Sequence, residues 1–262
     1  MNGILCAFLG TFLTFSATAF GSAGIFFLKK EISSQLQSGF LGFAGGVMTA
    51  ASVWSLLLPG MQYAEENGQI VWLIITGGFF LGTAVLLIAD IFIKKQYLNN
   101  ENKCFSSIDK STLMLITAIT VHNIPEGMSV GLAFALAAQN DFAPALLTGA
   151  FSLAIGIAVQ NFPEGTAVAL PLIKNGMTKQ NAFLIASMTA LVEPIFGVLA
   201  AAFSYFANSA ISAALAFAAG TMIYVVVEEL IPQAHTDNDS KSGTIGFLIG
   251  FLIMMVLDVS LG

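Results

Sequence analysis

The sequence predicts an all-α integral membrane protein with eight transmembrane helices, on three observations. Of its 262 residues, 56% are hydrophobic and only 9% are charged, whereas soluble domains usually carry about 25% charged residues. Hydrophobic runs of about 20 residues recur along the chain, and a run of this length crosses the hydrocarbon layer as a helix. The sequence lacks the roughly ten-residue alternating segments that are typical of membrane β-barrels. The lipid bilayer is therefore expected to be the main solvent of this chain.

The expected helices follow one another with mostly short polar connections. They lie at about 3–28, 38–62, 70–95, 112–138, 144–172, 180–206, 209–232 and 243–261. Together they form one transmembrane domain that covers residues 1–262. The longest polar connection is the segment at about 96–111. The first run is long and has no basic residues before it, so it predicts a first span and not a cleaved signal.

The lysines predict the orientation of these spans. The sequence has no arginine, and all nine lysines lie in or beside the first, third, fifth and seventh connections. The remaining connections carry Glu65, Glu66 and Asp141 instead. Under the positive-inside rule, the connections that are rich in lysine face the cytoplasm. We therefore expect both termini outside and the segment 96–111 in the cytoplasm.

Two neighbouring spans carry the same polar motif near their middle, HNIPEG at residues 122–127 and QNFPEG at residues 160–165. A helix brings positions four apart onto one face. The first and fifth positions of each motif therefore share a face, which pairs His122 with Glu126, and Gln160 with Glu164. Each motif also contains a proline, which cannot donate a hydrogen bond to the carbonyl four residues earlier. Carbonyl oxygens left free in this way at membrane depth need a partner or a polar cavity.

A third mid-span carboxylate, Glu193, is followed by Pro194, which is expected to free the Ala190 carbonyl. One ionised carboxylate near the bilayer centre costs at least roughly 2.5–3.5 kcal/mol on insertion scales. A divalent cation is the simplest compensation for three such groups beside one histidine. Nitrogen and carboxylate oxygen together suit zinc or a neighbouring transition metal, whereas a site made of oxygen alone would indicate magnesium or calcium. The structural alternative is that these groups only hydrogen-bond neighbouring helices.

With these motifs, the chain resembles the ZIP (Zrt-, Irt-like protein) family of divalent-metal transporters, in its bacterial-type branch. The resemblance implies a 3+2+3 arrangement in which the first and last three helices are related by inverted pseudosymmetry. It also implies a binuclear site, with the two motif glutamates shared by both metals. One position would be formed by His122, Gln160, Glu126 and Glu164, and the other by Asn123, Asn161 and Glu193 with the same glutamates. Some relatives have Asp where this chain has Asn161, which leaves the occupancy of the second position open.

Two further sets of residues are weaker candidates. The segment 46–55 (GVMTAASVWS) resembles the family's pathway-lining segment, in which Met48 would be a soft metal ligand and Ser55 a polar lining residue. Three polar residues near the inner end of the span at 209–232 form a candidate metal exit site: Glu228, Glu229 and His235. Solvated or interfacial charges are the alternative interpretation of this second set.

The predicted function is transport of divalent metal ions into the cytoplasm, through a midplane site and by alternating access between the two sides. Zinc (Zn²⁺) is the first expected substrate, and Cd²⁺, Fe²⁺ and Mn²⁺ accept the same ligand types. The rival is an intramembrane zinc-dependent hydrolase with an open water position on its metal. An enzyme does not need matched ligands on two successive spans, so a transporter and not an enzyme is expected. The expected environment is a cell membrane, specifically a bacterial inner membrane, with no nucleic-acid partner; a homodimer is left open.

Overall fold

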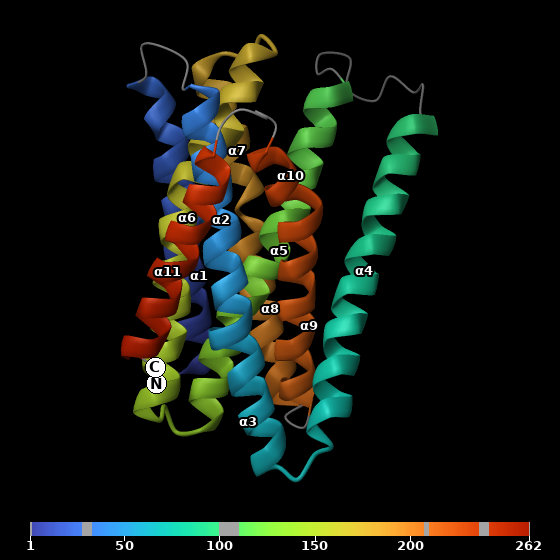
Figure 1. The fold of residues 1–262 in the computed structure, drawn as a ribbon, viewed down its shortest axis with the longest axis vertical. Helices are drawn as coiled ribbons and strands as arrows, with labels where there is room; N and C mark the ends of the chain where they lie inside the picture. Colours follow the sequence, from blue (N-terminus) through green and yellow to red (C-terminus); the bar gives the residue numbers. More distant parts are fainter. Residues whose placement is uncertain (1, 28–32, 100–109, 207–209, 236–240, 262) are drawn as a thin grey trace.

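The structure is a computed structural model that describes residues 2–27, 33–99, 110–206, 210–235 and 241–261. Every regular element within these ranges is helical, and the long helices run side by side along one axis (Figure 1). In chain order they are α1 (Gly3–Ala23), α2 (Ser34–Ala51), α3 (Leu58–Glu66), α4 (Val71–Asn99), α5 (Lys110–Gln139), α6 (Pro144–Lys174), α7 (Lys179–Thr189), α8 (Val192–Phe206), α9 (Ile211–Val225), α10 (Ile231–Ala234) and α11 (Ser242–Leu261).

Seven helical segments of the described chain are long and apolar enough to cross a membrane, judged by length and composition. They are Gly3–Phe26, Ser34–Glu66, Val71–Lys95, Pro144–Lys174, Lys179–Phe206, Ile211–Ala234 and Ser242–Ser260. Each of them overlaps one expected span. The remaining expected span, at about 112–138, corresponds to α5, which has 30 residues. This helix carries the motif at 122–127 and packs against α1, α6, α8 and α9. Its neighbours are thus largely protein, which explains why it can be more polar than the others.

Three of the expected spans are irregular inside. A π-helical turn, Ser52–Leu57, joins α2 to α3, and a second one, Val226–Leu230, joins α9 to α10. A proline follows each turn, at Pro59 and Pro232, and the missing N–H of proline disrupts the regular i→i−4 ladder. The third irregular span is divided into α7 and α8.

The break between α7 and α8 corrects one expectation from the sequence. The Glu193 amide donates a hydrogen bond to the Ala190 carbonyl at 3.0 Å. The prediction that Pro194 leaves this carbonyl free is therefore wrong. The chain leaves the helical path at Ala190 and Leu191 and begins a new helix, so the short turn uses the oxygen that a continuous helix would have left unpaired.

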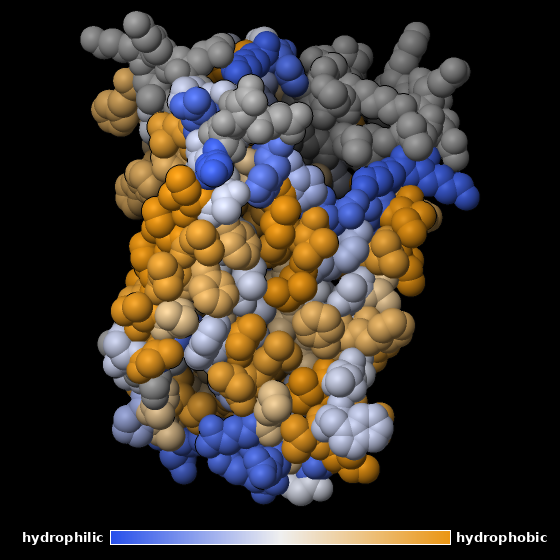
Figure 2. All heavy atoms as spheres, in the orientation of Figure 1, coloured by the Kyte–Doolittle hydropathy of each residue, from blue (hydrophilic) through white to orange (hydrophobic). Residues whose placement is uncertain are grey.

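The surface of the bundle has the polarity that a bilayer requires. Figure 2 shows hydrophobic side chains around the middle of the molecule on this face, with hydrophilic residues gathered toward its two ends. Phe20 and Phe80 are 71% and 70% exposed, respectively. Exposed apolar surface of this extent would be unfavourable in water and is expected for helices that face lipid.

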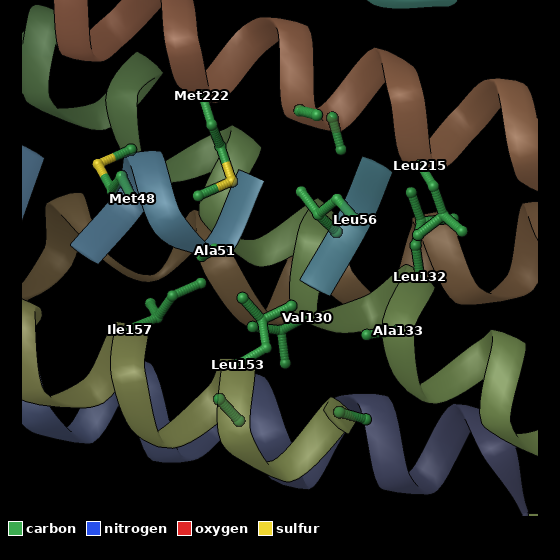
Figure 3. Close-up of a cluster of buried hydrophobic side chains, with 14 of the residues drawn as sticks. Met48, Ala51, Leu56, Val130, Leu132, Ala133, Leu153, Ile157, Leu215 and Met222 are labelled. Carbon is green, nitrogen blue, oxygen red and sulfur yellow. The ribbon is translucent and has the colours of Figure 1, made fainter. Parts of the chain in front are cut away.

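The helices pack as two groups. The first contains α1, α5, α6, α7 and α8, and the second contains α2, α3, α4, α9, α10 and α11. Glycines bring helix backbones close together within each group, because a Cβ on Gly21 would collide with the Phe162 carbonyl, and one on Gly246 with the Gly39 carbonyl. Large apolar side chains of both groups meet at the boundary, including Met48 and Leu56 from the second group and Val130, Leu153 and Ile157 from the first (Figure 3).

Candidate metal centre

The two polar motifs meet in the middle of the first group, where α5 packs against α6. His122, Glu126 and Glu164 each offer one ligand atom, and these three atoms lie within 4.8 Å of one another. The His122 Nε2 atom is 3.6 Å from the Glu126 Oε1 atom, which is too far for a hydrogen bond. His122 and Glu126 are buried, with exposed fractions of 3% and 0%, and Glu164 is 9% exposed. One nitrogen and two carboxylates thus converge at a distance that a single ion can bridge.

A chain of hydrogen bonds connects this cluster with the rest of the predicted ligands. The Gln160 side-chain amide donates to the Glu126 carboxylate and lies 3.4 Å from the Asn161 Oδ1 atom. The Asn161 amide in turn donates to the Glu193 carboxylate at 3.1 and 3.2 Å, and lies 3.4 Å from the Thr14 carbonyl. Six of the seven predicted ligands therefore form one continuous buried cluster that draws on α5, α6 and α8.

Several side-chain atoms in this cluster have no hydrogen-bond partner among the described residues. They are His122 Nε2, Glu126 Oε2, Gln160 Oε1 and Glu164 Oε2. Buried polar atoms in native proteins are rarely left unpaired, because each one loses its hydration without compensation. The unpaired atoms are of the nitrogen and oxygen types that hold zinc. The donor set therefore fits a divalent metal ion as the missing partner.

Asn123, the seventh predicted ligand, differs from the other six. Its side chain is buried, at 1% exposed, and neither its Oδ1 nor its Nδ2 atom has a hydrogen-bond partner in the described part of the chain. The structure thus leaves the amide available, but no described contact ties it to the cluster. Its role as a ligand stays a prediction.

The three candidate exit residues have different partners. The Glu229 Oε2 atom is 3.4 Å from the His122 Nδ1 atom, so Glu229 adjoins the central cluster. The Glu228 carboxylate pairs with Lys94 at 3.0 Å. His235 lies 2.9 Å from the Ile231 carbonyl and 3.1 Å from the Thr244 hydroxyl. Glu228 and Glu229 nevertheless line one cavity, whereas His235 does not line it, so the structure does not gather all three residues into one exit site.

The pathway-lining candidates are also separated. Met48 is fully buried in the hydrophobic core, in the same cluster as Met222 and Ile157 (Figure 3). Ser55 donates to both oxygens of Asp258, at 2.9 and 3.0 Å. The proposed roles of Met48 and Ser55 in a metal pathway stay predictions.

The environment of Asp258 was not anticipated from the sequence. Its carboxylate also accepts a hydrogen bond from Ser152 at 2.9 Å, and it lines a cavity of about 310 Å³ together with Ser55 and Trp54. The available signal was a single carboxylate within the apolar run at 243–261. Asp258 is far from Ser55 and Ser152 in the sequence, so no local pattern indicated that these residues are in contact.

Comparisons with known proteins show the family of this chain. The model of the ZIP zinc transporter family matches residues 99–258. The chain is 32% identical to zinc transporter ZIP11 of Homo sapiens, over 100% of this chain and 98% of that protein. It is 33% identical to zinc transporter GufA of Myxococcus xanthus, over 97% and 98% of the two chains. It is 35% identical to zinc transporter ZIPB of Bordetella bronchiseptica, over 98% of this chain and 81% of that protein. The chain belongs to the ZIP zinc transporter family.

Proposed function

We propose that this protein carries zinc into the cytoplasm through the cluster of His122, Glu126 and Glu164, and that Cd²⁺, Fe²⁺ and Mn²⁺ can follow the same route. The observation that supports this most directly is the convergence of three buried ligand atoms within 4.8 Å of one another, with unpaired nitrogen and oxygen atoms facing the same cluster. The printed names of its relatives as zinc transporters put zinc first among the substrates. Ligands of mixed type also accept the neighbouring ions.

We propose that all eight helical segments cross the membrane, with both termini outside, as one transmembrane domain. The length of α5 and its position among four other helices support an eighth span. The start of α1 and the end of α11 lie at the same end of the bundle (Figure 1), as an even number of crossings requires. The ends of α4 and α6 that carry lysines lie at the opposite end, together with the start of α11, which follows Lys241. The positive-inside rule makes that end cytoplasmic.

The inverted repeat of the proposed 3+2+3 arrangement has support from the packing pattern. Helix α1 packs on α6 as α8 packs on α5, and α2 packs on α11 as α9 packs on α4. Exchanging the first three spans with the last three, and α5 with α6, converts each pair into another pair. The close contacts follow the same rule, because Gly165 abuts the Thr18 carbonyl as Gly127 abuts the Glu193 carbonyl. Such repeats bracket a midplane site in many transporters.

Alternating access would arise at the boundary between the two helix groups. Two apolar grooves of about 670 and 940 Å³ lie along this boundary, one bordered by α4, α5, α8 and α9 and the other by α2, α6 and α11. The close backbone contacts of Gly21, Gly127, Gly165 and Gly246 lie within the groups. Relative movement of two groups that are each held together internally can expose the central cluster to one side and then to the other.

The hydrolase alternative is less consistent with these observations. A catalytic zinc keeps three protein ligands and an open water position, whereas the cluster here is extended by hydrogen-bonded amides from Gln160 and Asn161. The relatives that match nearly the full length of the chain are named zinc transporters, which favours a transporter over an enzyme.

Radiolabelled zinc uptake by proteoliposomes tests the proposal. Glu126→Ala is expected to abolish nearly all uptake, because it removes a ligand that adjoins His122, Gln160 and Glu164. Glu65→Ala is the matched control, since Glu65 is an exposed carboxylate near the end of α3. Equal uptake by the wild type and Glu126→Ala would overturn the assignment of this cluster as the transport site.

A further inference from the structure

Lys94 lies between two carboxylates at the end of the bundle that carries the lysines. Its Nζ atom is 2.7 Å from Asp90 Oδ2, on the same helix, and 3.0 Å from Glu228 Oε1. The Tyr224 hydroxyl lies 3.4 Å from the same Asp90 oxygen. One ammonium group thus connects α4 to the π-helical turn between α9 and α10.

These groups line a cavity of about 180 Å³ that adjoins the central metal cluster. Its polar lining consists of Asp90, Lys94, Tyr224, Glu228, Glu229 and Gln233. The Glu229 carboxylate belongs to this lining and also approaches the His122 imidazole at 3.4 Å. Glu229 thus places this cavity beside the central cluster.

The charges of the cavity are unevenly balanced. Three carboxylates and one ammonium line it, and Lys94 is the one cationic side chain among its described lining residues. Three carboxylates that line one small cavity can supply the oxygen ligands of a divalent ion. The ammonium occupies two of them, Asp90 and Glu228, and leaves Glu229 to approach His122. Lysine is suited to this role because its compact positive charge sits on a flexible stem.

We propose that Lys94 is a tethered cation that prevents the carboxylates of this cavity from capturing the metal ion on its way out. This inference rests on the proposed function, in which ions leave the central cluster toward the cytoplasm. Conduction requires sites that bind an ion well enough to admit it and weakly enough to release it. By satisfying Asp90 and Glu228, the ammonium leaves a passing ion with one carboxylate where it would otherwise find three. Lys94 thus acts through its neighbours and speeds release.

The competing explanation is a structural ion pair that only joins α4 to the π-helical turn. The two explanations differ in what happens when the ammonium is removed. Loss of a purely structural pair would change stability slightly, because partly exposed ion pairs contribute little, and would leave the zinc stoichiometry unchanged. A tethered cation, once removed, uncovers a metal site that the wild type does not have.

Zinc binding to the purified protein, measured by equilibrium dialysis, separates these explanations. Lys94→Gln is expected to bind an additional zinc equivalent per chain and to take up zinc more slowly in proteoliposomes. Lys94→Arg, which keeps a cation, should match the wild type in stoichiometry. Lys95→Gln is the matched control, because Lys95 is the adjacent lysine of α4, is exposed and does not line the cavity.

The extra zinc should be independent of the central cluster. In a Glu126→Ala background, which disables the proposed transport site, Lys94→Gln should still add a zinc equivalent, and adding Glu228→Gln should remove it. If the proposed function fails, Glu126→Ala leaves uptake and zinc binding unchanged, yet this gain remains measurable. Lys94→Leu, which also removes the charge and adds no metal ligand, provides a second variant in case Lys94→Gln does not fold. If neither variant binds more zinc than the wild type, the inference is wrong.

Discussion

The side-chain amide of Asn161 donates to both carboxylate oxygens of Glu193, at 3.1 and 3.2 Å. The Nδ2 atom is therefore directed at Glu193, and the Oδ1 atom lies 3.4 Å from the Gln160 amide. Of the two polar atoms of an amide group, only the oxygen binds a metal ion. For Asn161 to act as a ligand beside Glu193, its amide group would have to turn over and give up these hydrogen bonds. Asn161 thus satisfies the Glu193 carboxylate in a way that competes with metal binding.

The first prediction follows from this competition. Asn161→Asp replaces the donor with a second carboxylate next to Glu193, so the pair needs a cation in place of a hydrogen bond. We expect the variant to bind one more zinc ion than the wild type, as measured by equilibrium dialysis at matched free zinc. Asn161→Ala serves as the comparison, because it removes the hydrogen bond without adding a ligand. A stoichiometry that is the same for the wild type and for Asn161→Asp would contradict this account.

A second prediction concerns metal removal. Zinc should stabilise the folded protein, because its ligand atoms converge only in the folded chain; a ligand at 100 times its Kd adds about 2.7 kcal/mol. We expect a chelator to lower the thermal midpoint of the wild type in detergent. Glu164→Ala should show a smaller difference between zinc and chelator, since it lacks one of the three converging ligands. An equal difference in both proteins would mean that zinc stabilises the fold from another site.

The helices were largely predictable from the sequence because their cause is local. An apolar run must pair its backbone groups internally when it lies in lipid, and a helix does so within one segment. Each expected span therefore has a helical counterpart in the structure. The interruptions were harder to predict. The helical path is interrupted at Ala190 and Leu191, whereas Pro194 lies three residues after Leu191. The sequence does not determine the position of such a break, because the chain can satisfy carbonyls near a proline in more than one way.

The candidate site was predictable where its spacing is helical and unpredictable where it depends on tertiary contacts. The four-residue spacing of the motifs placed His122 beside Glu126. No local pattern indicated that Glu229, from a distant helix, approaches the other nitrogen of His122. The same is true of Asp258, which meets a serine from each helix group. Adjacent residues such as Glu228 and Glu229 can also have different partners, because neighbouring positions on a helix do not face the same way.

A third prediction separates the two histidines of the chain. His122→Ala should abolish most zinc uptake, because its Nε2 atom is one of the three converging ligand atoms and has no other partner among the described residues. His235→Ala is the matched control, since His235 lies within hydrogen-bonding distance of Ile231 and Thr244 and outside the cluster. It should retain uptake close to that of the wild type in the same proteoliposomes. If both variants lost uptake to the same degree, the assignment of His122 to the transport site and of His235 to a place outside it would be wrong.

The last prediction tests whether close helix contact holds the metal ligands in place. Gly165 directly follows Glu164 in the sequence, and a Cβ at Gly165 would collide with the Thr18 carbonyl. A Cβ at Gly149, on the same helix, would meet nothing within 4 Å. Overpacking of a tight contact costs about 1–3 kcal/mol, and here it would also push α6 away from α1. We expect Gly165→Ala to lower the thermal midpoint and to reduce zinc affinity, while Gly149→Ala leaves both unchanged or slightly raises the midpoint, because alanine favours helix over glycine. If Gly165→Ala lowered only the midpoint and bound zinc with unaltered affinity, the position of Glu164 would have to be set by contacts other than this one.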